Sequence, residues 1–121
     1  MTDYLTLEDQ LWIAEEALLP AVRDLGLLDS AALRPRTSLF GDDAYPTLEE
    51  KAAVLLESIV RNHSLVDGNK RLGWLAVTLF LRRNGREFHV PHDDAYDLVI
   101  GIAEGRIDYH ESAAMLARWT P

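Results

Sequence analysis

Two apolar segments with helical character, joined by a short polar stretch, limit most strongly what this chain can fold into. Thr47-Leu48-Glu49-Glu50 has the pattern of a capping box, and the helix it begins is expected to end near Asn62. One face of that helix carries an apolar stripe made of Ala52, Leu55, Leu56, Ile59 and Val60. The segment Leu72 to Leu81 is apolar almost all round, which predicts a second helix in the middle of the domain. The polar stretch between them is His63-Ser64-Leu65-Val66-Asp67-Gly68-Asn69-Lys70-Arg71.

Helical signals also precede this unit. Thr6-Leu7-Glu8-Asp9 is a second capping box, and the spacing predicts a helix from Leu7 to about Leu25 that Gly26 stops. Pro20 is expected either to bend this helix or to split off its last turn. A short helix capped by Asp29 and ended by Pro35 is expected next. The segment from Arg34 to Pro46 has no sustained period, which indicates a long loop with room for a small hairpin.

Three further signals follow the unit. Arg82, Arg83, Asn84 and Gly85 should end the central helix, and 86–90 is expected to be a short extended piece. Pro91 with Asp93 or Asp94 begins a helix to about Glu104, and Asp108 caps a last helix to about Trp119. We therefore expect an all-α bundle of five or six helices around a buried central helix, forming a single domain over residues 1–121.

Composition excludes several classes of function. The chain has no cysteine, so disulfide and thiolate chemistry are excluded and a cytoplasmic location is expected. No apolar run approaches the roughly 20 residues of a membrane span, and the start MTDYLTLEDQ lacks the cations of a signal peptide. A net charge of −8 disfavours direct binding to nucleic acid.

The polar stretch has the groups that phosphate binding needs. If the second helix begins at Gly68 or Asn69, then Lys70 and Arg71 lie in its first turn, where unpaired N–H groups and the helix dipole already favour an anion. Cations in that turn destabilise a helix unless a negative ligand offsets them. Gly68 lets a ligand approach the backbone, and Asp67 can hold Mg²⁺ that bridges two phosphate groups.

His63 precedes Asp67 by four residues, so both can face one cavity. A histidine with a pKa near neutral can accept the proton of an attacking hydroxyl, as transfer to Ser, Thr or Tyr requires. Arg61 is a weaker candidate for stabilising charge on the transferred group. Taken singly, His63 can be a helix cap, Asp67 an N-cap, and Lys70 and Arg71 solvated charges, and only their conjunction indicates a phosphate site.

The nine-residue stretch resembles the signature of the Fic/Doc family, in the Doc form H-x-F-x-[DN]-[AG]-N-K-R and not the Fic form H-P-F-x-x-G-N-G-R. The resemblance extends over the whole chain, including Gly26 to Leu33, the long loop, and the helix end at Leu79 to Gly85. It implies an all-α Fic/Doc-type fold. Leu65 departs from the usual phenylalanine, and we expect it to anchor the loop in the core as the aromatic residue would.

The resemblance also implies an activity. Fic proteins transfer AMP to a protein hydroxyl, whereas Doc toxins transfer the γ-phosphate of ATP to a threonine of elongation factor Tu and stop translation. Lys70 stands where Fic proteins have a second glycine, which favours an altered nucleotide pose and kinase chemistry.

Motif positions then assign the roles. His63 would be the base, Asp67 the Mg²⁺ ligand, Gly68 and Asn69 the anion cradle, and Lys70 and Arg71 the phosphate clamps. The loop around 36–40 would be a flap that aligns the target.

Regulation would come from a second protein. The inhibitory pattern [ST]-x-x-x-E-[GN] of Fic proteins is absent, since Ile100 stands where Glu104-Gly105 would need a hydroxyl residue. Doc toxins are held by the antitoxin Phd, whose C-terminal segment folds onto the toxin, so a Phd-like partner is expected.

Three alternatives remain at this point. One is AMP transfer at the same site. A second is a metal-dependent hydrolase using His89, His92-Asp93 and His110, although their spacing fits no familiar zinc site. The third is a catalytically idle binding module, which the intact His63 argues against.

Overall fold

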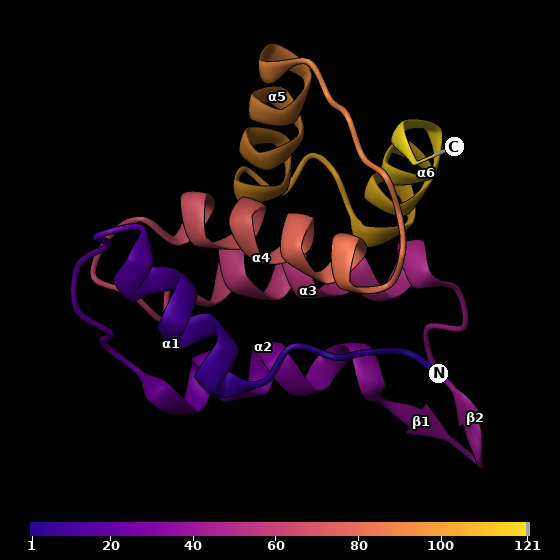
Figure 1. Ribbon diagram of the computed structural model, residues 1–121, viewed down its shortest axis with the longest axis horizontal. Coiled ribbons are helices and arrows are strands. Elements are labelled where there is room, and N and C mark those ends of the chain that lie inside the picture. The colour runs from indigo at the N-terminus through magenta and orange to yellow at the C-terminus, as the bar shows by residue number, and fades with distance from the viewer. Residues whose placement is uncertain (121) are drawn as a thin grey trace.

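The computed structural model describes residues 1–120 and contains six α-helices and one β-hairpin (Figure 1). The helices are α1 (Leu7–Glu16), α2 (Leu25–Leu33), α3 (Leu48–Asn62), α4 (Asn69–Arg83), α5 (His92–Ala103) and α6 (Tyr109–Trp119). A short 3₁₀ turn, Arg34–Arg36, leads into the hairpin of β1 (Ser38–Leu39) and β2 (Asp42–Asp43). No helix within residues 1–120 has the length and apolar character to cross a membrane. The expected all-α fold with a small hairpin is confirmed.

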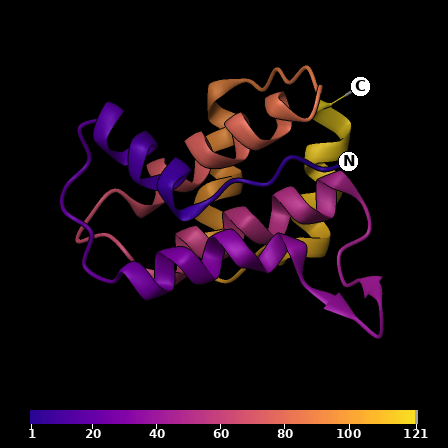
Figure 2. The ribbon, with the colours of Figure 1, turned by 60° about the horizontal axis from the view of Figure 1, so that its bottom comes forward.

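The central helix is α3 and not, as the sequence predicts, the helix over Leu72 to Leu81. Ten consecutive residues of α3, from Lys51 to Val60, are buried, because α2, α4, α5 and α6 all pack against it (Figures 1 and 2). In α4, by contrast, Trp74 and Leu75 are only partly buried. Small residues in α3, such as Ala52 and Ala53, let neighbouring helices approach from every side.

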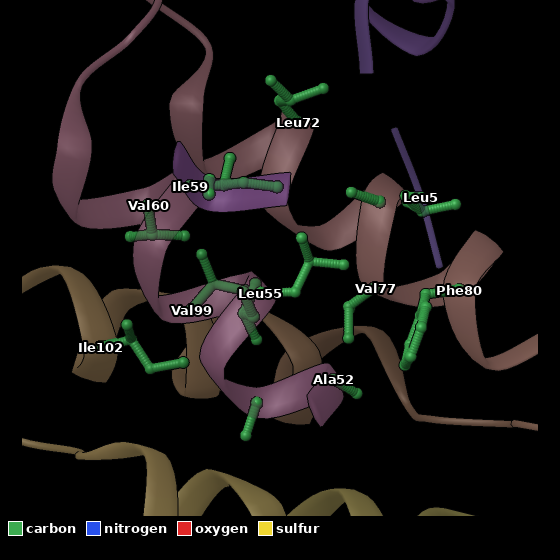
Figure 3. Packing of buried hydrophobic residues seen from close by; sticks show 14 of the residues in the cluster. Leu5, Ala52, Leu55, Ile59, Val60, Leu72, Val77, Phe80, Val99 and Ile102 are labelled. Atoms are coloured by element: carbon green, nitrogen blue, oxygen red, sulfur yellow. The ribbon is translucent and has the colours of Figure 1, made fainter. Parts of the chain in front are cut away.

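Apolar side chains from distant parts of the chain meet around α3. Figure 3 shows α3 residues between side chains of α4 and α5, with Leu5 of the N-terminal segment beside Phe80. The labelled residues of this core are Leu5, Ala52, Leu55, Ile59, Val60, Leu72, Val77, Phe80, Val99 and Ile102. The core therefore fixes α4 and α5 on α3, which sets the position of the loop that joins α3 to α4.

The first helix is shorter than expected. It ends at Glu16, because Leu18 adopts a left-handed backbone with φ of 56° and turns the chain away from the helix axis. Asp24 caps the next helix by accepting a hydrogen bond from the Leu27 N–H at 3.0 Å, so Asp29 is not the cap and Gly26 lies inside α2. The predicted single helix to Leu25 is thus two helices with a loop at residues 17–24.

The later boundaries agree with the sequence. Thr47 and Asp108 accept hydrogen bonds from the N–H groups of Glu50 and Glu111, which caps α3 and α6 as expected. Gly85 follows α4 with a φ of 81°. The segment 86–90 is irregular and pairs with no strand among the described residues.

The hairpin is held to α3 by a buried lysine. Lys51 is only 2% exposed. Its ammonium group donates to the Asp43 carboxylate at 3.0 Å and to the Tyr45 carbonyl. Arg34 adds a second attachment, donating to Glu57 at 2.9 Å and to Ser58 at 3.0 Å. Of these four charged residues Lys51 and Glu57 are buried, and each has a charged hydrogen-bond partner, which is what makes its burial tolerable.

Candidate functional site

The loop between α3 and α4 is held in place by the loop between α1 and α2. The two loops lie at the same end of the molecule (Figures 1 and 2), and Val22 pairs with Leu65 as an antiparallel bridge. The Ser64 carbonyl accepts hydrogen bonds from the N–H groups of Arg23 at 2.7 Å and Asp24 at 3.0 Å. The polar stretch therefore follows a path fixed by another part of the chain.

His63 caps the C-terminal end of α3 in a left-handed conformation, with φ of 53° and ψ of 45°. This backbone costs an L-residue roughly 1–2 kcal/mol, so contacts must hold it there. The Arg23 guanidinium donates to the His63 carbonyl. His63 as a whole is exposed, as a proton acceptor for a second protein must be.

Asn69 organises the loop with its side chain. Its amide accepts from the Leu65 N–H at 2.9 Å and donates to the Leu65 carbonyl at 3.1 Å, and the residue is 9% exposed. The side chain is thus bound to the loop backbone, and only the main chain of Asn69 is left to contribute to an anion cradle. Leu65 itself is 1% exposed and belongs to the core, which confirms the expected anchor.

The N-terminal end of α4 carries no side-chain cap and no acidic residue in its first turn. Gly68 precedes it with a φ of 86°, a conformation suited to glycine, and a Cβ there would lie 3.0 Å from Leu19 Cδ2. Asp67 accepts a hydrogen bond from the Gly68 N–H through Oδ1 at 2.8 Å. Its other oxygen, Oδ2, accepts no hydrogen bond within residues 1–120. The first N–H groups of α4 are therefore available to a ligand.

Lys70 and Arg71 line a cleft between α4 and α5 with a volume of about 270 Å³. Apolar and aromatic side chains form most of its walls, with Trp74 on α4 and Tyr96 on α5. The remaining lining residues are His92, Ala95, Val99 and Ile100. A cationic end next to an apolar interior suits a ligand that carries both phosphates and a flat ring.

Arg61 makes its contacts elsewhere. Its guanidinium donates to the carbonyls of Ile102 and Ile107, both at 2.9 Å, and lies 3.5 Å from the Glu57 carboxylate. These contacts bind the α5–α6 connection to α3. We therefore do not retain Arg61 as a ligand in the proposed site.

The histidines of the hydrolase alternative do not form a metal centre. Within residues 1–120 no group of three or more His, Cys, Asp or Glu side chains is arranged to hold a metal ion. Mg²⁺ makes a different demand, since it commonly binds one or two carboxylates together with waters and substrate phosphates. The exposed Asp67 carboxylate, just before the N-terminal end of α4, fits that pattern.

Arg23 and the structural role of Asn69 were not foreseen from the sequence. Arg23 lies 40 residues before His63, in a segment expected to be helical, and no local pattern links the two. Asn69 carries a motif signal, but its hydrogen-bond partner depends on the path of the loop.

Comparison with known proteins assigns the chain to a family. The sequence model described as the Fic/DOC family matches residues 2–81. The toxin Doc of Mycolicibacterium smegmatis is 46% identical over 121 residues, which cover 97% of this chain and 93% of that protein. The protein kinase doc of Escherichia phage P1 is 33% identical over 101 residues, which cover 83% of this chain and 78% of that protein. With its helical bundle and its polar joint between α3 and α4, the chain belongs to the Fic/DOC family.

Proposed function

We propose that this protein is the toxin of a toxin–antitoxin module and a kinase that transfers the γ-phosphate of ATP to a threonine of a translation factor, with elongation factor Tu as the expected target. The observation that carries the proposal is the uncapped N-terminal end of α4, where Lys70 and Arg71 border the α4–α5 cleft and His63 lies on the loop that leads into it. The names of the two relatives, a toxin and a protein kinase, support the same role.

The transfer follows from the groups at this joint. His63 accepts the proton of the target hydroxyl, whose oxygen attacks the γ-phosphorus, and the bond to the β-phosphate oxygen breaks to release ADP. The backbone N–H groups that follow Gly68 bind phosphate oxygens, and Lys70 and Arg71 offset the charge of the transferred group. The aromatic walls of the cleft, Trp74 and Tyr96, suit the adenine ring.

Asp67 would hold the Mg²⁺ that accompanies the nucleotide. One of its oxygens is bound by the Gly68 N–H, which orients the carboxylate at the helix end, and the other is left for the ion. When bound, Mg²⁺ neutralises charge on the phosphates. This role of Asp67 can be tested by titrating the wild type and Asp67→Asn with ATP, with and without Mg²⁺. The substitution should weaken binding of the nucleotide only when the ion is present.

Lys70 distinguishes phosphate transfer from AMP transfer. It stands where Fic proteins have a second glycine, and its side chain fills space at the phosphate end of the cleft. Incubation of the protein and elongation factor Tu with ATP labelled at either the α- or the γ-phosphate tests the assignment. Label in the target from the γ-position alone is expected, whereas label from the α-position alone would establish AMP transfer.

A growth experiment tests whether the site is used at all. Expression of the wild-type protein without a partner should arrest growth, and His63→Ala should not, since it removes the proton acceptor while the fold persists. Exposed His110 on α6 provides a matched control, because His110→Ala should remain as toxic as the wild type. Equal toxicity of wild type and His63→Ala would contradict the mechanism, and the absence of toxicity in both would favour an idle binding module.

A Phd-like antitoxin is the expected partner, and the cytoplasm, where translation takes place, is the expected location. Co-expression of a small protein from the adjacent reading frame should restore growth. If the antitoxin covers the α4–α5 cleft, it should also displace bound nucleotide in a competition titration.

A further inference from the structure

The loop between α1 and α2 brings the Arg23 guanidinium to the main chain of His63, the proposed base. The Arg23 side chain donates from Nη2 to the His63 carbonyl. The main-chain N–H of Arg23 donates to the Ser64 carbonyl at 2.7 Å. Val66, on the other side of the motif loop, donates its N–H to the Ala21 carbonyl at 3.2 Å. Contacts from residues 21–24 therefore bracket the turn on which His63 is displayed.

This turn needs external support. His63 has a φ of 53°, in the region that L-residues rarely adopt, and it also ends α3, whose last carbonyls have no partner within the helix. A guanidinium that binds the His63 carbonyl satisfies one of these acceptors and places positive charge at the negative end of the helix dipole. It thereby favours the left-handed backbone that sets the direction of the imidazole.

The Arg23 side chain has no other polar partner within residues 1–120. It belongs to none of the ion pairs within residues 1–120, and it is exposed. An exposed arginine without a carboxylate partner adds little to stability, so a role at the loop explains its contact better than a role in folding does.

We propose that Arg23 is a positioning residue, which holds the His63 backbone through its carbonyl so that the imidazole meets the target hydroxyl. The inference rests on the proposed function, because it assigns His63 the part of proton acceptor. Since displacement of a catalytic group by about 1 Å can cost about 100-fold in rate, loss of this contact should lower kcat strongly. It should leave the binding of ATP unchanged, because Arg23 does not line the α4–α5 cleft.

The experiment compares three variants for transfer from ATP to elongation factor Tu. Arg23→Ala should lower kcat by about 10- to 100-fold and change the KM for ATP less than about threefold. Arg23→Lys keeps a cationic donor and should recover a large part of the rate, and added guanidinium ion should partly rescue Arg23→Ala. Arg118→Ala removes an exposed arginine of α6 and should behave like the wild type.

Two further readouts separate the possible failures. In Arg23→Ala the NMR signals of the His63 amide and Cα, which report its backbone conformation, should move, and in Arg118→Ala they should not. An unchanged kcat, or a loss confined to the KM for ATP, would overturn the role of Arg23. If the wild type neither binds ATP nor labels a protein, the proposed function fails, and the NMR comparison still tests whether Arg23 holds the His63 backbone.

Discussion

Replacement of Asn69 by alanine should destabilise the protein, because its side chain satisfies both main-chain groups of one buried residue. The amide binds the Leu65 N–H at 2.9 Å and the Leu65 carbonyl at 3.1 Å. Leaving two buried polar groups without partners costs about 1–2 kcal/mol each, or about 2–4 kcal/mol together. Alanine recovers roughly 0.5 kcal/mol through its higher helix propensity, so the net loss should be about 1.5–3.5 kcal/mol.

Urea denaturation followed by circular dichroism measures this loss. With an m-value of about 1.5 kcal/mol per molar, the midpoint of unfolding should fall by about 1–2.3 M and m should not change. Asn62→Ala is the matched control at the other end of the loop. It removes a single, longer hydrogen bond to the Leu27 carbonyl, at 3.3 Å, and should cost about 1 kcal/mol or less.

The outcome discriminates between two roles of Asn69. If its side chain served the nucleotide alone, Asn69→Ala would weaken ATP binding and leave the free energy of unfolding within about 0.5 kcal/mol of the wild type. That result, or a loss no larger than that of Asn62→Ala, would refute the structural assignment.

Three further predictions concern other parts of the fold. The Arg83 guanidinium beside Asp9 lowers the pKa of that carboxyl, so the pair stabilises the folded state above the ordinary pKa of aspartate and ceases to do so as pH falls through the lowered value. In urea titrations Arg83→Met should therefore cost about 0.5–1 kcal/mol at pH 7, and the cost should shrink as pH falls below the ordinary pKa of aspartate. Gly68→Ala should cost about 1–2 kcal/mol in the same assay because its φ is 86°, and it should weaken ATP binding in calorimetry. Lys51→Met should keep the helical circular dichroism signal but detach the hairpin at 38–43, so limited proteolysis should cut there first; protection equal to that of the wild type would contradict the anchor.

The helix boundaries that local chemistry determines could be predicted, and those that tertiary contacts determine could not. Thr47 and Gly85 mark the start of α3 and the end of α4 with side-chain and backbone preferences that act within a few residues. The end of α1 has no such mark. Its apolar spacing continues through Leu19, and the chain leaves the helix only because Leu18 becomes left-handed.

The same distinction applies to the site. The motif indicated a helix that begins at Gly68 or Asn69 with cations in its first turn, and α4 begins at Asn69. The segment Leu72 to Leu81 was placed in the middle of the domain because it is apolar almost all round, but α3 lies there instead. Even the charged residues Lys51 and Glu57 of α3 are buried, each with a charged partner. Partners distant in sequence, such as Arg23 for His63, leave no periodic signal.

The pairing of residues 21–24 with residues 63–66 also affects when the site can form during folding. Contacts between segments about 40 residues apart are slow to close, because the chain entropy of the intervening loop must be overcome before they contribute. The second wall of the cleft comes from α5, which is synthesised later still. We therefore expect a ribosome-bound chain that ends before α5 to lack the proposed nucleotide site. If the proposed activity is correct, harm to the cell that makes the protein begins only when synthesis has passed that helix.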